Sequence, residues 1–309
     1  MLQLPTEITA YLYYCACEKN LGSHTLRAYK TDLHQFSEHC EKTNFVLDRS
    51  CISGYISLLH AKYKPKSVKR KIASLKAFCM YLHDMDTLDI NPFERIRISY
   101  KEPIVLPKTI SLSTMERLFD SLYTQLGSAK NDSYRQRLLL RDIATIELLF
   151  ATGMRVSEVC SLRSDDIDLS SGIAKILGKG SRERVMQIEN PSALFAIQQY
   201  YQQHTDAILS CGFLLVSRKG TRLSEQSVRL RLTRITKEAE ISQHITPHMI
   251  RHTFATLLLE EDVDIRFIQQ MLGHSSINTT QIYTHVALTK QKEILALKHP
   301  RNRIITGQA

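Results

Sequence analysis

The sequence has no apolar run of the length that a membrane span requires. None of its 309 residues lies in a stretch that approaches ~18 consecutive apolar side chains. The first twenty residues lack a basic segment and already contain Glu7, so we expect no signal peptide. Internal repeats and low-complexity tracts are also absent. These absences favour a globular protein that does not associate with a membrane, and we expect it in the cytoplasm.

Cysteine is present, but not in a pattern that builds a site. There are seven cysteines, an odd number, and only Cys15 and Cys17 stand close together without a second close pair. This spacing supports neither a disulfide framework nor a zinc ribbon. Free thiols in a reducing compartment are the simpler interpretation.

Positive charge exceeds negative charge along the whole chain. Lys and Arg number 41 against 31 Asp and Glu, giving a net charge of +10. There are 15 basic and 11 acidic residues up to residue 107, and 26 and 20 after it. At about 100–200 residues per domain, the length predicts two domains. A basic excess in both domains favours an anionic partner that is held from two sides.

Helical periodicity dominates the sequence on both sides of one proline-containing segment. Residues 1–98 predict helices with almost no strand signal. Residues 99–107 contain Pro103 and Pro107 and no helical period, which predicts an extended linker. Residues 108–309 predict further helices, one of them ending at Gly153, and a β-hairpin around Gly178-Lys179-Gly180. The expected fold class is therefore mainly α, with two domains and a small antiparallel sheet in the second. The apolar stripes that define two of the N-terminal helices are Leu26, Tyr29, Leu33 and Phe36, and Val68, Ile72, Leu75, Phe78 and Leu82.

A cluster of seven basic residues with no acidic residue among them follows in the first domain. Such a cluster repels itself unless an anion neutralises it, and lysines on a helix can bind DNA phosphates. A solvated helix face is the alternative, but such faces usually mix charges of both signs. We predict that the cluster binds DNA: Lys62, Lys64, Lys66, Lys69, Arg70, Lys71 and Lys76.

The second cluster is the segment Thr246 to His252. Thr246 can cap a helix and Pro247 suits its first position, which puts His248 in the first turn and Arg251 on the same face. The expected buried stripe of this helix is Ile250, Phe254, Leu257 and Leu258. A helix N-terminus with an imidazole and a guanidinium is suited to phosphate.

A zinc site is the competing interpretation, because His244, His248 and His252 are spaced four residues apart. The metalloprotease pattern requires Glu directly after the first His, and Met249 stands there instead. Pro247 also interrupts a continuous helix from His244. A phosphate-loop interpretation of Gly178-Lys179-Gly180 fails too, since the glycine spacing and the Ser or Thr after the lysine do not match.

Four further local strings complete a recognisable set: ATGMRVSEVCSL, LGKGSRER, HMIRHTFAT and LGHSSINTTQIYTHV. Taken together they resemble the motifs of the tyrosine recombinase (phage integrase) family. HTLRAYKTDLHQF is similar to the core-binding domain of that family, a SAM-like helical domain. The compact spacing is most similar to Xer-type recombinases. The residues that match the catalytic set of the family are Arg155, Lys179, His248, Arg251, His274 and Tyr283.

The resemblance implies an enzyme that cuts and rejoins DNA through a 3′-phosphotyrosyl intermediate and a Holliday junction, without metal or cofactor. Tyr283 would be the nucleophile, Arg155 and Arg251 a phosphate clamp, and His248 the base. Lys179 would be the general acid and His274 would donate a hydrogen bond to the phosphate. Residues 1–98 would be the core-binding domain and residues 108–309 the catalytic domain with a C-terminal tail.

The implied partner is duplex DNA with an inverted-repeat site, bound by a homo-tetramer or together with a second recombinase, in association with the nucleoid. Glu158 would orient Arg155, or it would lie on the helix surface without a role at the site. A catalytically idle DNA-binding regulator and a type IB topoisomerase-like enzyme are the alternatives. Asp262 departs from the family, because relatives usually carry glycine there, at a helix end where a positive φ can be required.

Overall fold

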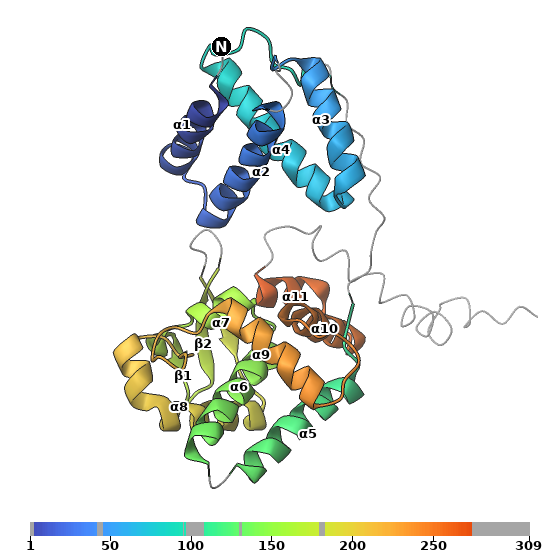
Figure 1. Ribbon diagram of the computed structural model, residues 1–309. Helices are drawn as coiled ribbons and strands as arrows, with labels where there is room; N and C mark the ends of the chain where they lie inside the picture. The colour runs from blue at the N-terminus through green and yellow to red at the C-terminus, as the bar shows by residue number, and fades with distance from the viewer. Residues whose placement is uncertain are drawn as a thin grey trace, which may run out of the picture. The chain divides into compact units, whose positions relative to one another are not determined.

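The computed structural model describes residues 3–41, 46–94, 96, 108–129, 132–178 and 183–273. The chain divides into two compact units, Met1–Ile104 and Val105–Ala309. The described residues form eleven α-helices, one short 3-10 helix and three short strands (Figure 1). The mainly helical fold class predicted from the sequence is confirmed. The predicted linker, residues 99–107, lies outside the described residues.

Four helices build the described part of the first unit. Asp48 starts the third of them by accepting a hydrogen bond from the backbone N–H of Cys51 at 2.8 Å, and Pro65 opens the fourth. The fourth helix packs against the other three. Its predicted apolar stripe is buried along its whole length, from Val68 to Leu82. The helices are α1 (Leu4–Cys17), α2 (Ser23–Glu41), α3 (Arg49–Lys62) and α4 (Pro65–Asp84).

The described part of the second unit combines seven α-helices with a small sheet. Its helices are α5 (Leu112–Ser128), α6 (Ser133–Thr152), α7 (Val156–Ser161), α8 (Pro191–Cys211), α9 (Glu225–Glu238), α10 (Pro247–Glu260) and α11 (Ile265–Leu272). The 3-10 helix η1 (Ser164–Asp166) leads into the strands β1 (Ile167–Asp168), β2 (Ile173–Leu177) and β3 (Glu183–Gln187).

Helix α6 forms the centre of this unit. It packs against α5, α7, α8 and α10 (Figure 1). Every residue from Leu139 to Leu149 is buried, which is typical of a helix surrounded by other elements. The helix ends at Gly153, as predicted, and this glycine has the left-handed conformation with φ 60°. The chain can therefore turn sharply into α7.

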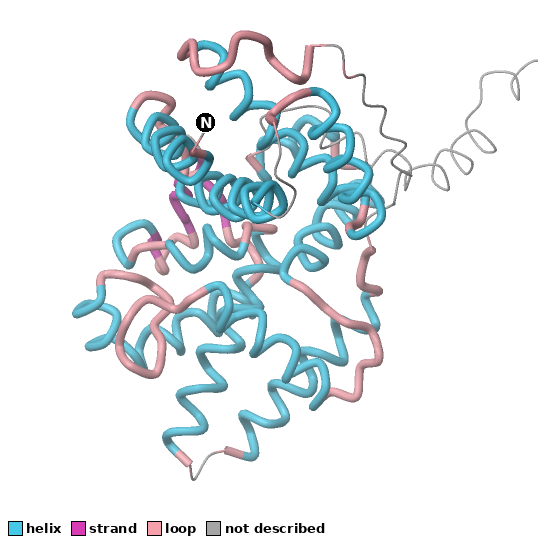
Figure 2. The backbone as a smooth tube through the Cα atoms, turned by 45° about the horizontal axis from the view of Figure 1, so that its top comes forward, coloured by secondary structure: helices cyan, strands magenta, loops and turns pink. Residues whose placement is uncertain are grey.

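The predicted hairpin is confirmed as β2 and β3, which pair antiparallel (Figure 2). Ile176 lies opposite Arg184, and Ala174 lies opposite Met186. Residues 179–182 at the tip of the hairpin are outside the described residues. The sequence analysis missed β1, because a two-residue strand is too short to show alternation.

Helix α10 begins as predicted but buries a different face. Thr246 accepts a hydrogen bond from the N–H of Met249 at 3.3 Å, and Pro247 follows it. Of the expected stripe only Ile250 is fully buried, whereas Phe254, Leu257 and Leu258 are half-buried. The prediction was wrong at three of its four positions, because Thr253 and Ala255 take buried places instead. The hydroxyl of Thr253 accepts from the N–H of Ile110, and Ala255 lies in an apolar cluster with Ile268 and Leu272 of α11. The other buried residues of this helix are Pro247, Met249, Arg251, Thr253, Ala255 and Thr256.

Candidate active site

Arg155 stands at the junction where α6 turns into α7. Its backbone N–H donates to Oε2 of Glu158 at 2.8 Å, and its Nη1 donates to Oε1 of the same carboxylate at 2.8 Å. Glu158 is in the first turn of α7, where a carboxylate also interacts favourably with the helix dipole. Its side chain is only 6% exposed, against 35% for Arg155. A buried carboxylate therefore holds a guanidinium that remains partly open to solvent.

Glu158 has a second strong partner in Arg184, which comes from β3. Arg184 Nη1 donates to Oε1 at 3.2 Å and Nη2 donates to Oε2 at 2.8 Å, so the contact is bidentate. Burial raises the pKa of Glu158, but the hydrogen bonds from Arg184 and Arg155 outweigh this effect, and the pKa lies below its ordinary value. Glu158 is accordingly ionised at neutral pH.

Arg251 of α10 lies against the same carboxylate. Its Nη1 is 4.0 Å from Oε2 of Glu158 and donates to the carbonyl of Gly153 at 2.7 Å. Its Nη2 donates to the carbonyl of Leu272, at the end of α11, also at 2.7 Å. The side chain is 5% exposed. Arg251 is thus fixed between the end of α6 and the end of α11.

His248 lies one turn before Arg251 on α10 and is exposed at the surface of the unit. Neighbouring protein still desolvates part of the ring, and this lowers its pKa from the ordinary 6.5. The charges of Arg229, Arg251 and Arg155 lower the pKa further, while Glu225 opposes them. The structure therefore brings Arg155 and Arg251 together at Glu158, and His248 is close enough to both arginines for their charges to act on its imidazole. The lowered pKa favours the neutral form of that imidazole.

The other three predicted site residues, Lys179, His274 and Tyr283, lie outside the described residues. Gly178 and Gly273 are the last described residues before them. His252, which follows Arg251, has a pKa lowered by burial first and then by the charges of His248 and Arg251.

Sequence reasoning placed Arg184 in a motif but assigned it no role. The alternation of the strand could have indicated a buried position for Arg184, because Arg184, Met186 and Ile188 are alternate residues and point to the same side. Met186 and Ile188 are both buried. An arginine on the buried face of a strand requires hydrogen-bond partners, and this one finds the carboxylate of Glu158.

The basic cluster of the first unit is less uniform than the sequence predicted. Lys71 is 5% exposed, and its Nζ donates to Asp32 Oδ1 at 2.9 Å and to Gln35. Arg70 also pairs with Asp32. A single carboxylate from α2 therefore forms ion pairs with two of the seven basic residues. We interpret Lys71 as structural and keep six exposed residues as the predicted DNA-binding set: Lys62, Lys64, Lys66, Lys69, Arg70 and Lys76.

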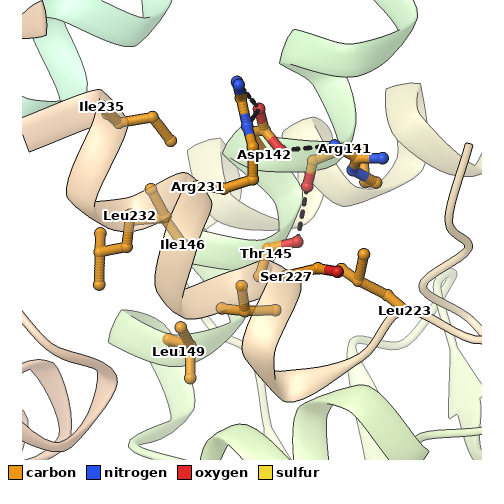
Figure 3. A pocket seen from close by; sticks show the side chains of 11 residues that line it. Arg141, Asp142, Thr145, Ile146, Leu149, Leu223, Ser227, Arg231, Leu232 and Ile235 are labelled. Carbon is orange, nitrogen blue, oxygen red and sulfur yellow. Dashed lines mark hydrogen bonds and ion pairs between the residues drawn. The ribbon is translucent and has the colours of Figure 1, made fainter.

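A pocket in the second unit lies between α6 and α9 (Figure 3). Asp142 accepts hydrogen bonds there from Arg141 and Arg231, and apolar side chains such as Leu149 and Leu232 line the rest. None of Arg155, His248 and Arg251 lines it. The predicted active site is therefore not in this pocket.

The described residues do not assemble the alternative zinc site. Across the part of the chain that the structure describes, which includes His244, His248 and His252, no three His, Cys, Asp or Glu side chains are placed to share a metal ion. No helix in that same part is long and apolar enough to cross a membrane.

Comparison with known proteins identifies the family of the chain. Residues 111–290 match the profile described as "Phage integrase family", and residues 8–85 match "Phage integrase, N-terminal SAM-like domain". A tyrosine recombinase of Agathobacter rectalis is 48% identical over 307 residues, covering 97% of this chain and 98% of that protein. Tyrosine recombinase XerD of Listeria innocua is 34% identical over 304 residues, covering 95% of this chain and 98% of its own.

A solved structure shows the same fold. XerH site-specific recombinase bound to difH substrate, in a pre-cleavage complex, superposes with a TM-score of 0.71 at 23% identity, covering 94% of this chain and 84% of that one. The chain belongs to the phage integrase family, whose members include the tyrosine recombinases. The resemblance inferred from the sequence motifs, and the enzyme class that it implied, are confirmed.

Proposed function

We propose that this chain is a site-specific recombinase that cuts and rejoins duplex DNA through a 3′-phosphotyrosyl intermediate and a Holliday junction. The observation that carries the proposal is the convergence of Arg155 and Arg251 on the buried carboxylate of Glu158, with His248 on the same helix as Arg251. A phosphodiester gains negative charge in the transition state of its cleavage, and fixed guanidiniums stabilise that charge.

The proposed reaction transfers the phosphoryl group twice. The phenol oxygen of Tyr283 attacks the scissile phosphorus, His248 accepts the phenol proton, and the 5′-oxygen leaves with a proton from Lys179. His274 donates a hydrogen bond to the phosphate. A 5′-hydroxyl of the exchanging strand then attacks the phosphotyrosine and gives its proton to Lys179, while Tyr283 leaves with the proton held by His248. The bond energy is conserved in the covalent intermediate, so the step requires no external energy source.

His248 suits the role of base because its pKa is lowered, which keeps the imidazole neutral near pH 7. In the proposed arrangement residues 1–98 bind the core of the site, residues 99–107 link the domains, and residues 108–309 carry the chemistry. Four copies would act together on an inverted-repeat site, or two copies would act with a second recombinase. The complex of XerH with its difH substrate supports duplex DNA as the partner.

The test is covalent trapping on a nicked suicide substrate that carries the recombination site. The wild-type protein should form a denaturant-resistant adduct with the 3′-phosphate, and it should do so in EDTA. Tyr283→Phe should bind the same DNA with wild-type affinity and form no adduct. An adduct that persists in Tyr283→Phe would overturn the assignment of the nucleophile. Cleavage that EDTA abolishes and a divalent metal restores would overturn the metal-free mechanism.

A further inference from the structure

Arg184 occupies an unusual place for an arginine, on the buried face of the small sheet. It lies in β3 directly opposite Ile176, which is 2% exposed. Residues opposite each other in an antiparallel pair point to the same face of the sheet. The Arg184 side chain is accordingly only 12% exposed. A guanidinium in such a position is stable only if its donors find partners.

The partners of Arg184 come from two elements that are distant in sequence. Its Nη1 and Nη2 donate to the two oxygens of Glu158 in α7, as described above. Its Nε donates to the carbonyl of Met271, near the end of α11, at 2.8 Å. A single planar side chain thus joins β3, α7 and α11, and the fork of the guanidinium fixes the relative orientation of all three.

The turn that ends α11 leaves little room beside Arg184. Gly273 has a φ of 65°, and a Cβ on this residue would lie 3.1 Å from Nη1 of Arg184 and 3.3 Å from its Cδ. Next to this contact, Arg251 donates to the carbonyl of Leu272 at 2.7 Å. Two arginines, one from β3 and one from α10, therefore bind successive carbonyls at the carboxyl end of α11, where the helix dipole favours positive charge.

We propose that Arg184 is a positioning residue for DNA cleavage: it orients the Glu158 carboxylate that holds the guanidinium of Arg155, and it fixes the carboxyl end of α11 beside Arg251. This inference rests on the recombinase function proposed above. It assigns Arg184 no contact with the phosphate itself. Its effect is on the geometry of the two phosphate-binding arginines, and small displacements of such groups strongly reduce rates.

The experiment compares three variants in single-turnover cleavage of the suicide substrate. Arg184→Met should form the covalent complex on the order of 100-fold more slowly, because a misplaced catalytic group costs about that much. Arg184→Lys should recover only part of the rate, since an ammonium lacks the planar fork. Affinity for a half-site should stay near the wild-type value. The matched control is Arg234→Met, which removes an exposed guanidinium that binds Glu238 on the surface of α9 and should leave the rate unchanged.

A double-mutant cycle separates positioning from a general loss of structure. Because Arg184 acts partly through Glu158, Arg184→Met should slow cleavage by a much smaller factor in the Glu158→Gln background than in the wild-type protein. A purely structural role predicts that the two losses multiply. Tyr200→Phe provides a second control, because it removes buried hydrogen bonds to Leu214 and Val216 away from the site and should lower stability without changing the rate of cleavage.

The pH dependence of cleavage gives an independent readout. The charged groups around Glu158 are Arg155 just before α7, Arg184 on β3 and Arg251 on α10. Without Arg184 the pKa of the Glu158 carboxyl should rise, because burial raises this pKa and the hydrogen bonds from Arg184 that lower it are lost. The ratio of the Arg184→Met rate to the wild-type rate should therefore fall as the pH is lowered. Loss of stability alone would leave this ratio constant.

The outcomes distinguish this inference from the proposed function. If the wild-type protein and Arg184→Met cleave at equal rates, the inference is wrong and the recombinase function stands. If the wild-type protein forms no covalent complex, the proposed recombinase function is wrong. Hydrogen exchange then tests whether Arg184 fixes the carboxyl end of α11. Amides of residues 265–273 should exchange faster in Arg184→Met than in Arg234→Met; equal exchange would refute the inference.

Discussion

The guanidinium of Arg251 is bonded to the backbone carbonyl of Gly153, with 2.7 Å between Nη1 and O. The contact joins the middle of α10 to the turn between α6 and α7, so it connects the helix that carries His248 with the residue two positions before Arg155. The glycine that ends α6 is therefore also a component of the predicted active site. It fixes one of the two phosphate-binding arginines through its backbone.

Gly153→Ala should reduce both stability and cleavage. The left-handed φ of 60° costs an alanine about 1–2 kcal/mol. A Cβ would also lie 2.4 Å from Cδ1 of Phe254 and 2.9 Å from Cδ2 of Leu272, so the neighbouring side chains would have to move. Chemical denaturation measures the first effect and single-turnover cleavage the second. Gly220→Ala is the control, because Gly220 has a similar φ of 70° and no neighbour within 4 Å. Equal effects of the two variants would contradict the prediction.

Cleavage should depend on the neutral form of His248. Its pKa is lowered by partial burial and by the charges of Arg229, Arg251 and Arg155. The rate should therefore be flat near pH 7 and fall only when the pH drops below the ordinary histidine value of 6.5 and the imidazole becomes protonated. His248→Gln should be slow, and its rate should no longer fall over this range. If the cleavage rate of His248→Gln still falls at acidic pH, protonation of a group other than His248 causes the decrease.

The exposed lysines of α4 should determine the salt dependence of DNA binding. Lys66→Ala with Lys69→Ala should reduce the slope of log K against log salt by about two units, one for each lost phosphate contact. Filter binding of a half-site at several salt concentrations measures this slope. An unchanged slope and affinity would mean that this face is only solvated.

Lys71→Met is the contrasting variant within the same cluster. Its ammonium is buried on Asp32, so the substitution should destabilise the first unit by about 3 kcal/mol, as the loss of one partner of a buried pair typically does. For the folded Lys71→Met protein, the slope of log K for DNA binding against log salt should equal that of the wild type. A reduced slope in Lys71→Met would contradict the structural interpretation of this residue.

Asp262→Gly should be more stable than Asp262→Ala by about 1 kcal/mol, because only glycine adopts the left-handed conformation without steric cost. Asp262 has a φ of 64° after the end of α10, where the sequence already suggested a positive φ. Both variants lose the aspartate side chain, so the comparison isolates the backbone effect. Equal midpoints of thermal unfolding would show that the turn relaxes around alanine.

The sequence by itself determined the elements and the identity of the candidate residues. Helices follow from apolar periodicity, caps from Thr246 and Pro247, the α6 terminus from Gly153 and the hairpin from alternation around Gly178. These signals are local, because each depends on the propensities and spacing of neighbouring residues. The six site residues came from motif strings, which are local for the same reason.

Only the tertiary structure decided which side chains share a partner. Asp32 is 39 positions from Lys71 in the chain, and Glu158 is 26 positions from Arg184. Each carboxylate forms an ion pair with a basic residue that sequence analysis had treated as free or had left without a role. Burial decides the outcome, since a charge removed from water must be paired, and pairing depends on how helices pack rather than on local spacing. Packing also decides the buried face of α10. Arg251 donates to the carbonyls of Gly153 and Leu272, Thr253 accepts from the N–H of Ile110, and Ala255 lies in an apolar cluster with Ile268 and Leu272 of α11.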